Sequence, residues 1–455
     1  MPVDRKDLFE NQKVLRAILT LALPSALGQI ILVIYNMADT LFVGLTGSDS
    51  LLSAVTVCMP AFMFLSAVSN LFGIGGSSVM ARALGCNDRE KAKHASAFAI
   101  WGCAAVTCLY CLGVLILMDP FIDLLGGSDP MIHAPARQYL IFAVLLGGLP
   151  TALNTLFSHL IRGTGHSTQA SIGVALGGIL NVALDPLFMF VILPKGSEAM
   201  GAAVATAVSN LCAFFYYLIL IARNREKFCI TVKPRKEMLK HRIPLDVFTV
   251  GIPACLMTLC ENLSYAVLDN LMSLSGAAAQ AGIGVAKKIN MLAHCTVRGL
   301  SQGVLPLIAY NYASGNRKRM RQVFGKSVSI AVILAAMCTA VNMAFARPLV
   351  NLFIHSDTGS DLLGMRFLRI LSVGAPFSAF AYAVISFFQA TGRGTRSLVL
   401  ALLRKGIVDI PLMYILTSLL PMYGIVWATP LADIVCCFTS VVLLRCFLKQ
   451  HGRGQ

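Results

Sequence analysis

Long apolar stretches alternate with short polar loops along the whole chain. Apolar runs of about twenty residues, such as 98–117, 172–192, 330–346 and 425–444, can cross a hydrocarbon core of about 30 Å as helices. The pattern predicts an all-α membrane protein with twelve transmembrane helices. The expected spans are 16–45, 52–79, 95–117, 138–160, 170–192, 200–222, 246–273, 282–311, 325–346, 367–390, 398–418 and 424–446.

The composition excludes a soluble protein. Hydrophobic residues make up 57% of the chain, charged residues only 13%, and the mean hydropathy is +0.75. Soluble domains carry about 25% charged residues. A chain of 455 residues with half that charge could not cover a water-soluble surface.

The net charge of +16 does not indicate a nucleic-acid partner, because of where the basic residues lie. They gather in alternate loops and are most frequent in the 223–242 connection. Cytoplasmic loops of membrane proteins carry such an excess of Lys and Arg. We therefore expect a multi-pass protein with both termini in the cytoplasm.

The two halves of the sequence repeat the same punctuation. Pro24 corresponds to Pro253, and Gly47 to Gly276, both at an offset of 229 residues. A steady offset is the mark of an internal repeat. Because each copy holds six predicted spans, the repeat predicts two six-helix bundles related by a pseudo-two-fold axis along the membrane normal. The predicted parts are an N-terminal lobe at 1–222, a basic cytoplasmic linker at 223–245 and a C-terminal lobe at 246–455.

The N-terminal half has two carboxylates inside predicted spans, Asp39 and Asp185, at similar depths. Ionisable groups within a membrane usually mark a transport pathway. Asn181 shares a helical face with Asp185, Tyr35 shares one with Asp39, and Thr206 lies at a similar depth. Oxygen groups of this kind suit Na⁺. Two neighbouring buried carboxylates also repel each other, so one of them is expected to accept a proton.

A structural alternative remains for these residues. Asp39 would then only hydrogen-bond a neighbouring helix, and Asp185-Pro186 would only be a kink. The matched depths on separate spans favour the cation or proton site. Pro24 lies in the same span as Asp39 and is a candidate hinge, because proline removes a helix hydrogen bond. No metal site is expected beyond Na⁺ at Asp39, Asn181 and Asp185.

The C-terminal half has a polar set of its own. Glu261 and Arg298 lie near the middle of their spans and are predicted to form an ion pair. Lys287 and His294 share the helical face of Arg298. Lys405 and Asp409 are spaced to pair within one span. These residues either pair structurally or line a polar cavity.

The ordered motifs resemble those of the multidrug and toxic compound extrusion (MATE) transporters, and within them the bacterial MepA-like branch. They are Leu23-Pro24, Tyr35-Asn36-x-x-Asp39-Thr40-x-x-x-Gly44, Asn181-x-x-x-Asp185-Pro186 and Pro306-x-x-x-Tyr310-Asn311-Tyr312. The resemblance implies a secondary antiporter that exports small amphipathic drugs or metabolites in exchange for H⁺ or Na⁺, by alternating access between two lobes.

The resemblance also assigns roles to positions of this chain. It implies a cation or proton site at Asp39, Asn181, Asp185 and Thr206, with Tyr35 nearby and Pro24 as the bend. Glu261 matches an acidic position that some members use. The aspartate that those members pair with it is absent here, and Phe380 and Tyr382 occupy that neighbourhood. Arg298 and Lys287 are a further departure, which would disfavour a strongly cationic drug if they line the cavity.

Two other function classes compete with export. A flippase for a lipid-linked or amphipathic anionic precursor would suit the basic C-terminal half. A membrane-embedded enzyme is disfavoured, because the sequence lacks H-E-x-x-H and G-x-S-x-G motifs. The expected partners are a small-molecule substrate and membrane lipid. We expect no cofactor apart from the coupling ion, and a monomer in the plasma membrane of a bacterium.

Overall fold

The computed structural model describes residues 5–46, 48–194, 196–240, 242–354 and 359–452, and all the regular structure in these ranges is helical. The long helices are α2 (Val14–Leu45), α3 (Asp49–Gly85), α4 (Arg89–Ile116), α7 (Gly148–Gly163), α8 (Ser167–Pro186), α9 (Glu198–Arg223), α11 (Ile243–Ser273), α12 (Ala277–Ala313), α13 (Arg317–Ala344), α15 (Ser360–Val373), α16 (Ala375–Ala390) and α19 (Tyr423–Gly452). The shorter elements are α1 (Arg5–Glu10), α5 (Met118–Leu124), α6 (Pro130–Leu140), η1 (Ile141–Leu146), η2 (Leu187–Ile192), α10 (Arg225–Phe228), η3 (Lys236–Leu239), α14 (Ala346–Asn351), α17 (Gly394–Leu402), η4 (Leu403–Ile407) and α18 (Asp409–Leu419).

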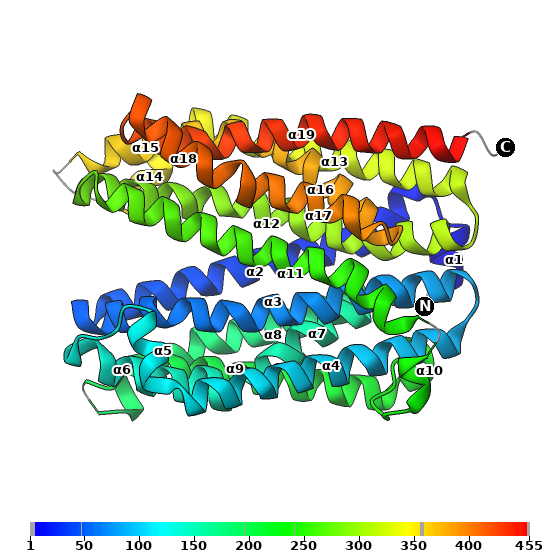
Figure 1. The fold of residues 1–455 in the computed structure, drawn as a ribbon, viewed down its shortest axis with the longest axis horizontal. Helices are drawn as coiled ribbons and strands as arrows, with labels where there is room; N and C mark the ends of the chain where they lie inside the picture. Colours follow the sequence, from blue (N-terminus) through cyan, green and yellow to red (C-terminus); the bar gives the residue numbers. More distant parts are fainter. Residues whose placement is uncertain (1–4, 47, 195, 241, 355–358, 453–455) are drawn as a thin grey trace. The chain divides into compact units, whose positions relative to one another are not determined.

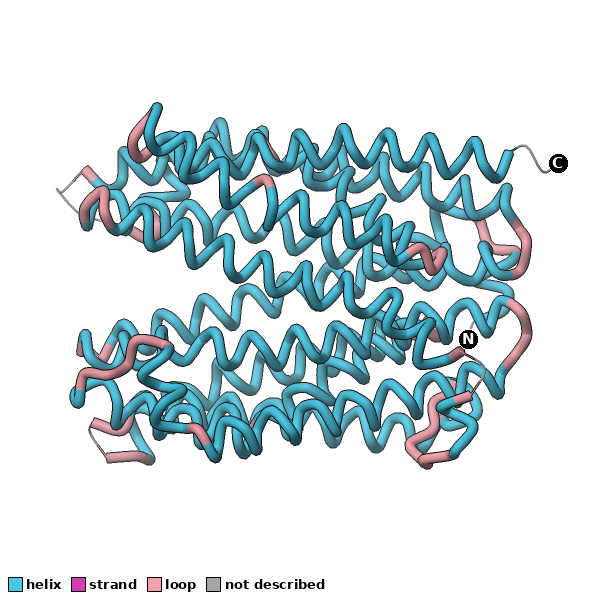
Figure 2. The backbone as a smooth tube through the Cα atoms, viewed as in Figure 1, coloured by secondary structure: helices cyan, strands magenta, loops and turns pink. Residues whose placement is uncertain are grey.

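These helices account for the twelve predicted spans. Eight described helices are long and apolar enough to cross a membrane, and two bent pairs raise the number to ten. The other two predicted spans correspond to α12 and to the run α17–η4–α18, both of which carry charged side chains such as Lys287 and Arg404. Short loops connect the helix ends (Figure 2). The all-helical membrane fold expected from the apolar pattern is confirmed.

Two predicted spans are bent. The span from Pro130 to Gly163 bends by 48° and the span from Ser360 to Ala390 by 43°. The breaks fall at Gly147 and Gly374, which lie 227 residues apart. That distance agrees with the offset of the repeat, so both halves bend at equivalent positions. The loops after these spans match as well, because Gly165 and Gly392 both adopt positive φ angles, of 82° and 71°.

The helices divide into two compact units, labelled in Figure 1. The N-terminal unit is Leu27–Cys255, and the C-terminal unit combines Met1–Ala26 with Leu256–Gln455. In the N-terminal unit α3 packs against α4, α6 and α7, and α8 packs against α9. In the C-terminal unit α12 packs against α13, α15 and α16, and α18 packs against α19. Each unit thus has its own helical core.

The boundaries of these units differ from the predicted lobes at 1–222 and 246–455. The helices α2 and α11 each pass from one unit into the other, at Ala26 and at Cys255. Each unit therefore takes the first part of one long helix from the opposite half of the sequence. Loop composition places a sequence boundary at the linker, but it carries no information on such an exchange of helix halves.

Glycines allow the exchanged helix halves to pack closely. A Cβ added at Gly303 of α12 would lie 2.6 Å from the carbonyl oxygen of Leu21 and 2.7 Å from Cα of Ala22. In the other unit, a Cβ at Gly251 of α11 would clash with the backbone of Leu71 in α3. Helices approach this closely in membranes where small residues line the contact.

We expect Gly303→Ala to destabilise the protein although alanine favours helix by up to about 1 kcal/mol. The added methyl must displace the α2 backbone, and such overpacking costs about 1–3 kcal/mol. Gly284→Ala in the same helix is the matched control, because a Cβ there meets no described atom within 4 Å. The measurement is the thermal unfolding midpoint in detergent. Equal midpoints for the two variants would contradict the close packing of α2 on α12.

Candidate functional site

Three predicted site residues meet in the N-terminal unit, on α8 and α9. The amide of Asn181 donates to Oδ1 of Asp185 at 3.2 Å and to Oγ1 of Thr206 at 3.3 Å. Asn181 and Thr206 are buried, and Asp185 is fully enclosed. The one-turn spacing of Asn181 and Asp185 places both on one helical face, as the sequence predicts. The structure therefore brings these three residues together.

Asp39 and Tyr35 approach the same region from α2. Tyr35 packs against Gly178 of α8, where an added Cβ would lie 3.0 Å from Cδ1 of the ring. Asp39 is close enough to Asp185 for their charges to interact. Pro24 lies in the same helix, two residues before α2 passes into the N-terminal unit at Ala26.

Several acceptor oxygens around these helices receive no hydrogen bond from any described residue. A buried acceptor without a donor costs free energy unless a cation, a proton or water satisfies it. These atoms belong to carboxylate and amide groups, the oxygen ligands that a hard cation prefers. The four atoms are Oδ1 of Asp39, Oδ1 of Asn154, Oδ1 of Asn181 and Oδ2 of Asp185.

The sequence-based prediction missed two amides of this network. Asn154 of α7 donates to Oδ1 of Asn210 at 2.8 Å, and Asn210 donates to the carbonyl oxygen of Thr206 at 3.0 Å. Both amides lie inside predicted spans, so their polarity within an apolar run was a usable signal. Their role is to tie α7 and α9 together next to the hydroxyl of Thr206.

A second cluster of charged residues lies inside the C-terminal unit. The predicted ion pair between Glu261 of α11 and Arg298 of α12 is present. The hydroxyl of Tyr382 donates to Oε1 of Glu261 at 3.0 Å. Arg404 of η4 reaches the same carboxylate at 3.9 Å and donates through Nε to Oδ1 of Asp433 at 3.0 Å. Sequence reasoning missed Arg404 and Asp433, because their pairing joins two spans that are distant in sequence.

The predicted pair of Lys405 and Asp409 is also present. Nζ of Lys405 donates to Oδ2 of Asp409 at 2.9 Å. The same carboxylate accepts hydrogen bonds from the hydroxyls of Ser264, at 2.6 Å, and Thr429, at 3.1 Å. Lys405 and Asp409 are both almost completely buried. Asp409 is thus satisfied at both oxygens.

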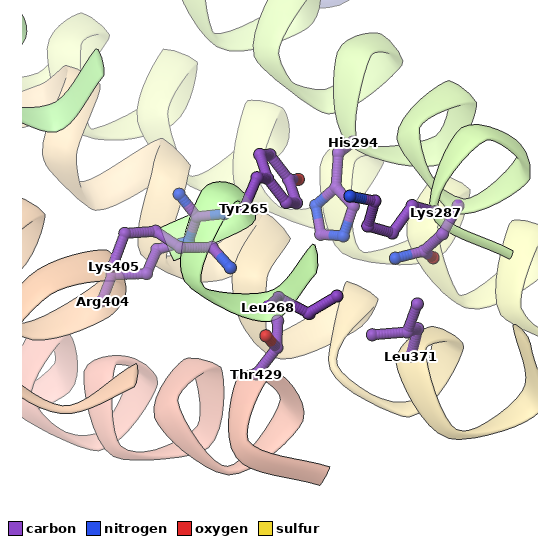
Figure 3. Close-up of a pocket in the computed structure, with 9 residues that line it drawn as sticks. Tyr265, Leu268, Lys287, His294, Leu371, Arg404, Lys405 and Thr429 are labelled. Atoms are coloured by element: carbon purple, nitrogen blue, oxygen red, sulfur yellow. The ribbon is translucent and has the colours of Figure 1, made fainter. Parts of the chain in front are cut away.

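A pocket opens beside this cluster (Figure 3). Lys287 and His294 line it as predicted, but Glu261 and Arg298 are not among its described lining residues, because they pair with each other nearby. The predicted polar cavity is therefore wrong for those two positions. The lining residues are Tyr265, Leu268, Lys287, Asn290, His294, Leu371, Arg404, Lys405 and Thr429.

The MatE family model matches the chain twice, at residues 24–187 and 253–415. The chain belongs to the MatE family. MATE transporters are the class that the sequence motifs resemble, and the two matched segments coincide with the two predicted copies of the repeat. The protein is therefore a membrane-spanning transporter and not an enzyme.

Curated relatives and solved structures agree with this membership. The chain is 27% identical to the multidrug export protein MepA of Staphylococcus aureus (strain MRSA252) over 439 residues, which is 96% of this chain and 94% of the relative. It is also 27% identical to MepA of Staphylococcus haemolyticus (strain JCSC1435) over 442 residues, with the same coverage of both chains.

Among solved structures, a MATE transporter in complex with MaD3S matches with a TM-score of 0.89 at 23% identity, over the full length of both chains. A multidrug resistance MATE family transporter in an outward-facing conformation matches with the same TM-score, identity and coverage. At this identity the structures establish the fold, which is the MATE fold. They leave the roles of individual site residues open.

Proposed function

We propose that this MATE protein is a secondary antiporter that exports small amphipathic drugs or metabolites in exchange for H⁺ or Na⁺. The four unsatisfied acceptor oxygens at Asp39, Asn154, Asn181 and Asp185 carry the proposal, because they form a buried polar set that a cation or proton would complete. The relatives named as multidrug export proteins support the choice of cargo.

The coupling ion would act through the conformation of α2. A cation or proton at Asp39 and Asp185 removes the repulsion between the two carboxylates, which allows α2 to pack differently on α8. Pro24 is the candidate bend, since α2 changes unit just after it. Substrate and ion then compete by favouring different states of an alternating-access cycle, each by its differential affinity for the two states.

The setting of this cycle follows from the charge pattern of the loops. We propose a monomer in the bacterial plasma membrane with both termini in the cytoplasm. Export is favoured over the flippase alternative because the matched relatives are named as drug exporters.

The test uses everted membrane vesicles that contain the protein, with ethidium or norfloxacin as the fluorescent drug. A Na⁺ gradient and a pH gradient are imposed separately. We expect at least one of the two drugs to accumulate in the vesicles when one of these gradients is imposed, and to leave them when that gradient is collapsed. Accumulation that requires ATP and ignores both gradients would contradict the proposal.

A further inference from the structure

The repeat places the charged cluster of the C-terminal unit at the positions of the N-terminal ion site. Asn181 and Asp185 correspond to Lys405 and Asp409 at an offset of 224 residues, and Thr206 corresponds to Thr429 at 223. These offsets fall between those of the flanking repeat positions. The C-terminal unit thus has a copy of the site in which a lysine replaces the asparagine.

A second element of the N-terminal site is repeated as well. Tyr35-x-x-x-Asp39 reappears as Tyr265-x-x-x-Asp269 at an offset of 230, one more than the offset of the prolines in the same helices. Lys287 donates a hydrogen bond to Asp269. The ring of Tyr265 lies between two lysines, with Nζ of Lys287 at 5.3 Å and Nζ of Lys405 at 5.2 Å from its centroid.

The two copies differ in which atoms lack partners. In the N-terminal copy the unsatisfied atoms are acceptors, including a carboxylate oxygen of both Asp39 and Asp185. In the C-terminal copy both oxygens of Asp409 accept hydrogen bonds, and Asp269 is paired with Lys287. A cation therefore finds spare acceptors in the first copy, but in the second the lysine ammonium groups already hold the carboxylates.

The pocket beside the second copy instead presents spare donors. Nη1 of Arg404 is buried without an acceptor from the described part of the chain. Lys287 and Lys405 each use one printed hydrogen bond of the three that an ammonium group can donate. None of the described residues that line the pocket is acidic. Figure 3 shows the side chains of Lys287 and His294 on one side of this space and of Arg404 and Lys405 on the other.

One lining atom does not follow this polarity. Oδ1 of Asn290 is an acceptor without a donor among the described residues. The amide of asparagine presents either its oxygen or its nitrogen after rotation by half a turn. Asn290 can therefore donate to a group in the pocket and does not oppose its cationic character.

We propose that this pocket binds the anionic group of the transported molecule, and that the protein therefore accepts amphipathic compounds carrying a carboxylate. Charge-assisted hydrogen bonds from Arg404, Lys287 and Lys405 would offset the cost of removing the carboxylate from water. The pocket encloses an empty volume of about 350 Å³, including its open mouth, which suits a small head group with an apolar body outside it. The proposal rests on the proposed export function, because it names the class of cargo.

Binding of a matched pair of probes to the purified protein in detergent tests the proposal. The probes are 1-pyrenebutyrate and its methyl ester, which share the apolar body and differ in the charge. We expect the wild-type protein to bind the acid at least tenfold more tightly than the ester, after subtraction of binding to protein-free micelles. We expect Lys287→Gln to remove this preference and to leave ester binding unchanged. Lys287 is suitable because its partner Asp269 is 46% exposed, so its loss does not strand a buried charge.

Lys288→Gln is the matched control, because it removes the same charge one residue away, at a position that is not among the described lining residues. It should keep the preference for the acid. Equal binding of acid and ester by the wild type would overturn the proposal without any variant. So would an equal loss of preference in Lys287→Gln and Lys288→Gln, which would indicate general surface charge. Wild-type vesicles that export ethidium or norfloxacin on an ion gradient while the purified protein shows no preference for the acid would refute only this inference. The converse result would refute only the proposed export function.

Discussion

Asp39→Asn and Asp185→Asn are each expected to abolish ion-driven drug export while protein levels in the membrane stay near those of the wild type. Asparagine keeps the size and the hydrogen-bonding oxygen of each side chain but removes the charge that a cation or proton neutralises. The measurement is drug accumulation in everted vesicles, normalised to the amount of folded protein. A reduction of tenfold or more is expected for each variant.

The double variant Asp39→Asn/Asp185→Asn should be no worse than either single variant, because residues that act as one unit are not additive. Asp119→Asn is the matched control, since Asp119 is an exposed carboxylate of the same unit that lies 3.7 Å from His133. This variant should transport as the wild type does. Export that persists in both single variants would exclude the N-terminal unit as the ion site.

Glu261→Gln is expected to cause the largest loss of stability. Glu261 is the carboxylate that Arg298, Tyr382 and Arg404 share, and its neutralisation leaves the guanidinium of Arg298 without its anion. Removal of one partner of a buried ion pair typically costs about 3–5 kcal/mol. The expected result is a lower thermal unfolding midpoint and a lower folded yield after solubilisation.

The ion pair is tested by the second change Arg298→Met in the Glu261→Gln protein. Replacement of a whole buried pair by neutral groups is often tolerated, so the double variant should regain a large part of the lost yield. Glu90→Gln, which removes one member of an exposed pair with Lys93, should change the midpoint little. A double variant as unstable as Glu261→Gln alone would show that Glu261 acts through other contacts.

The spans and the repeat could be predicted from the sequence because both are written locally. Each apolar run must satisfy its own backbone hydrogen bonds in the membrane, so run length alone identifies a spanning helix. The bends at Gly147 and Gly374 and the exchange of the first part of α2 were not predictable in this way. They depend on which helices pack together, which the hydropathy pattern does not record.

The candidate site was predictable where its residues lie one turn apart on one helix. Asn181 with Asp185 and Lys405 with Asp409 have this spacing, and both contacts are present. The partners from other helices were missed, as for Asn210 with Asn154 and Arg404 with Asp433. The correspondence of Lys405 with Asn181 was also missed, because the pattern sought was one of like residues and the two copies differ in charge.

Exchange of drug against the coupling ion in proteoliposomes is the most direct test of the proposed function. The purified protein is reconstituted without any ion gradient, and a gradient of the transported drug is imposed. Movement of H⁺ or Na⁺ in the opposite direction, followed with a pH-sensitive or Na⁺-sensitive dye inside the liposomes, is the expected result. The Asp39→Asn protein should show no such movement. Drug that crosses the membrane through the wild-type protein without any opposing ion flux would contradict the account.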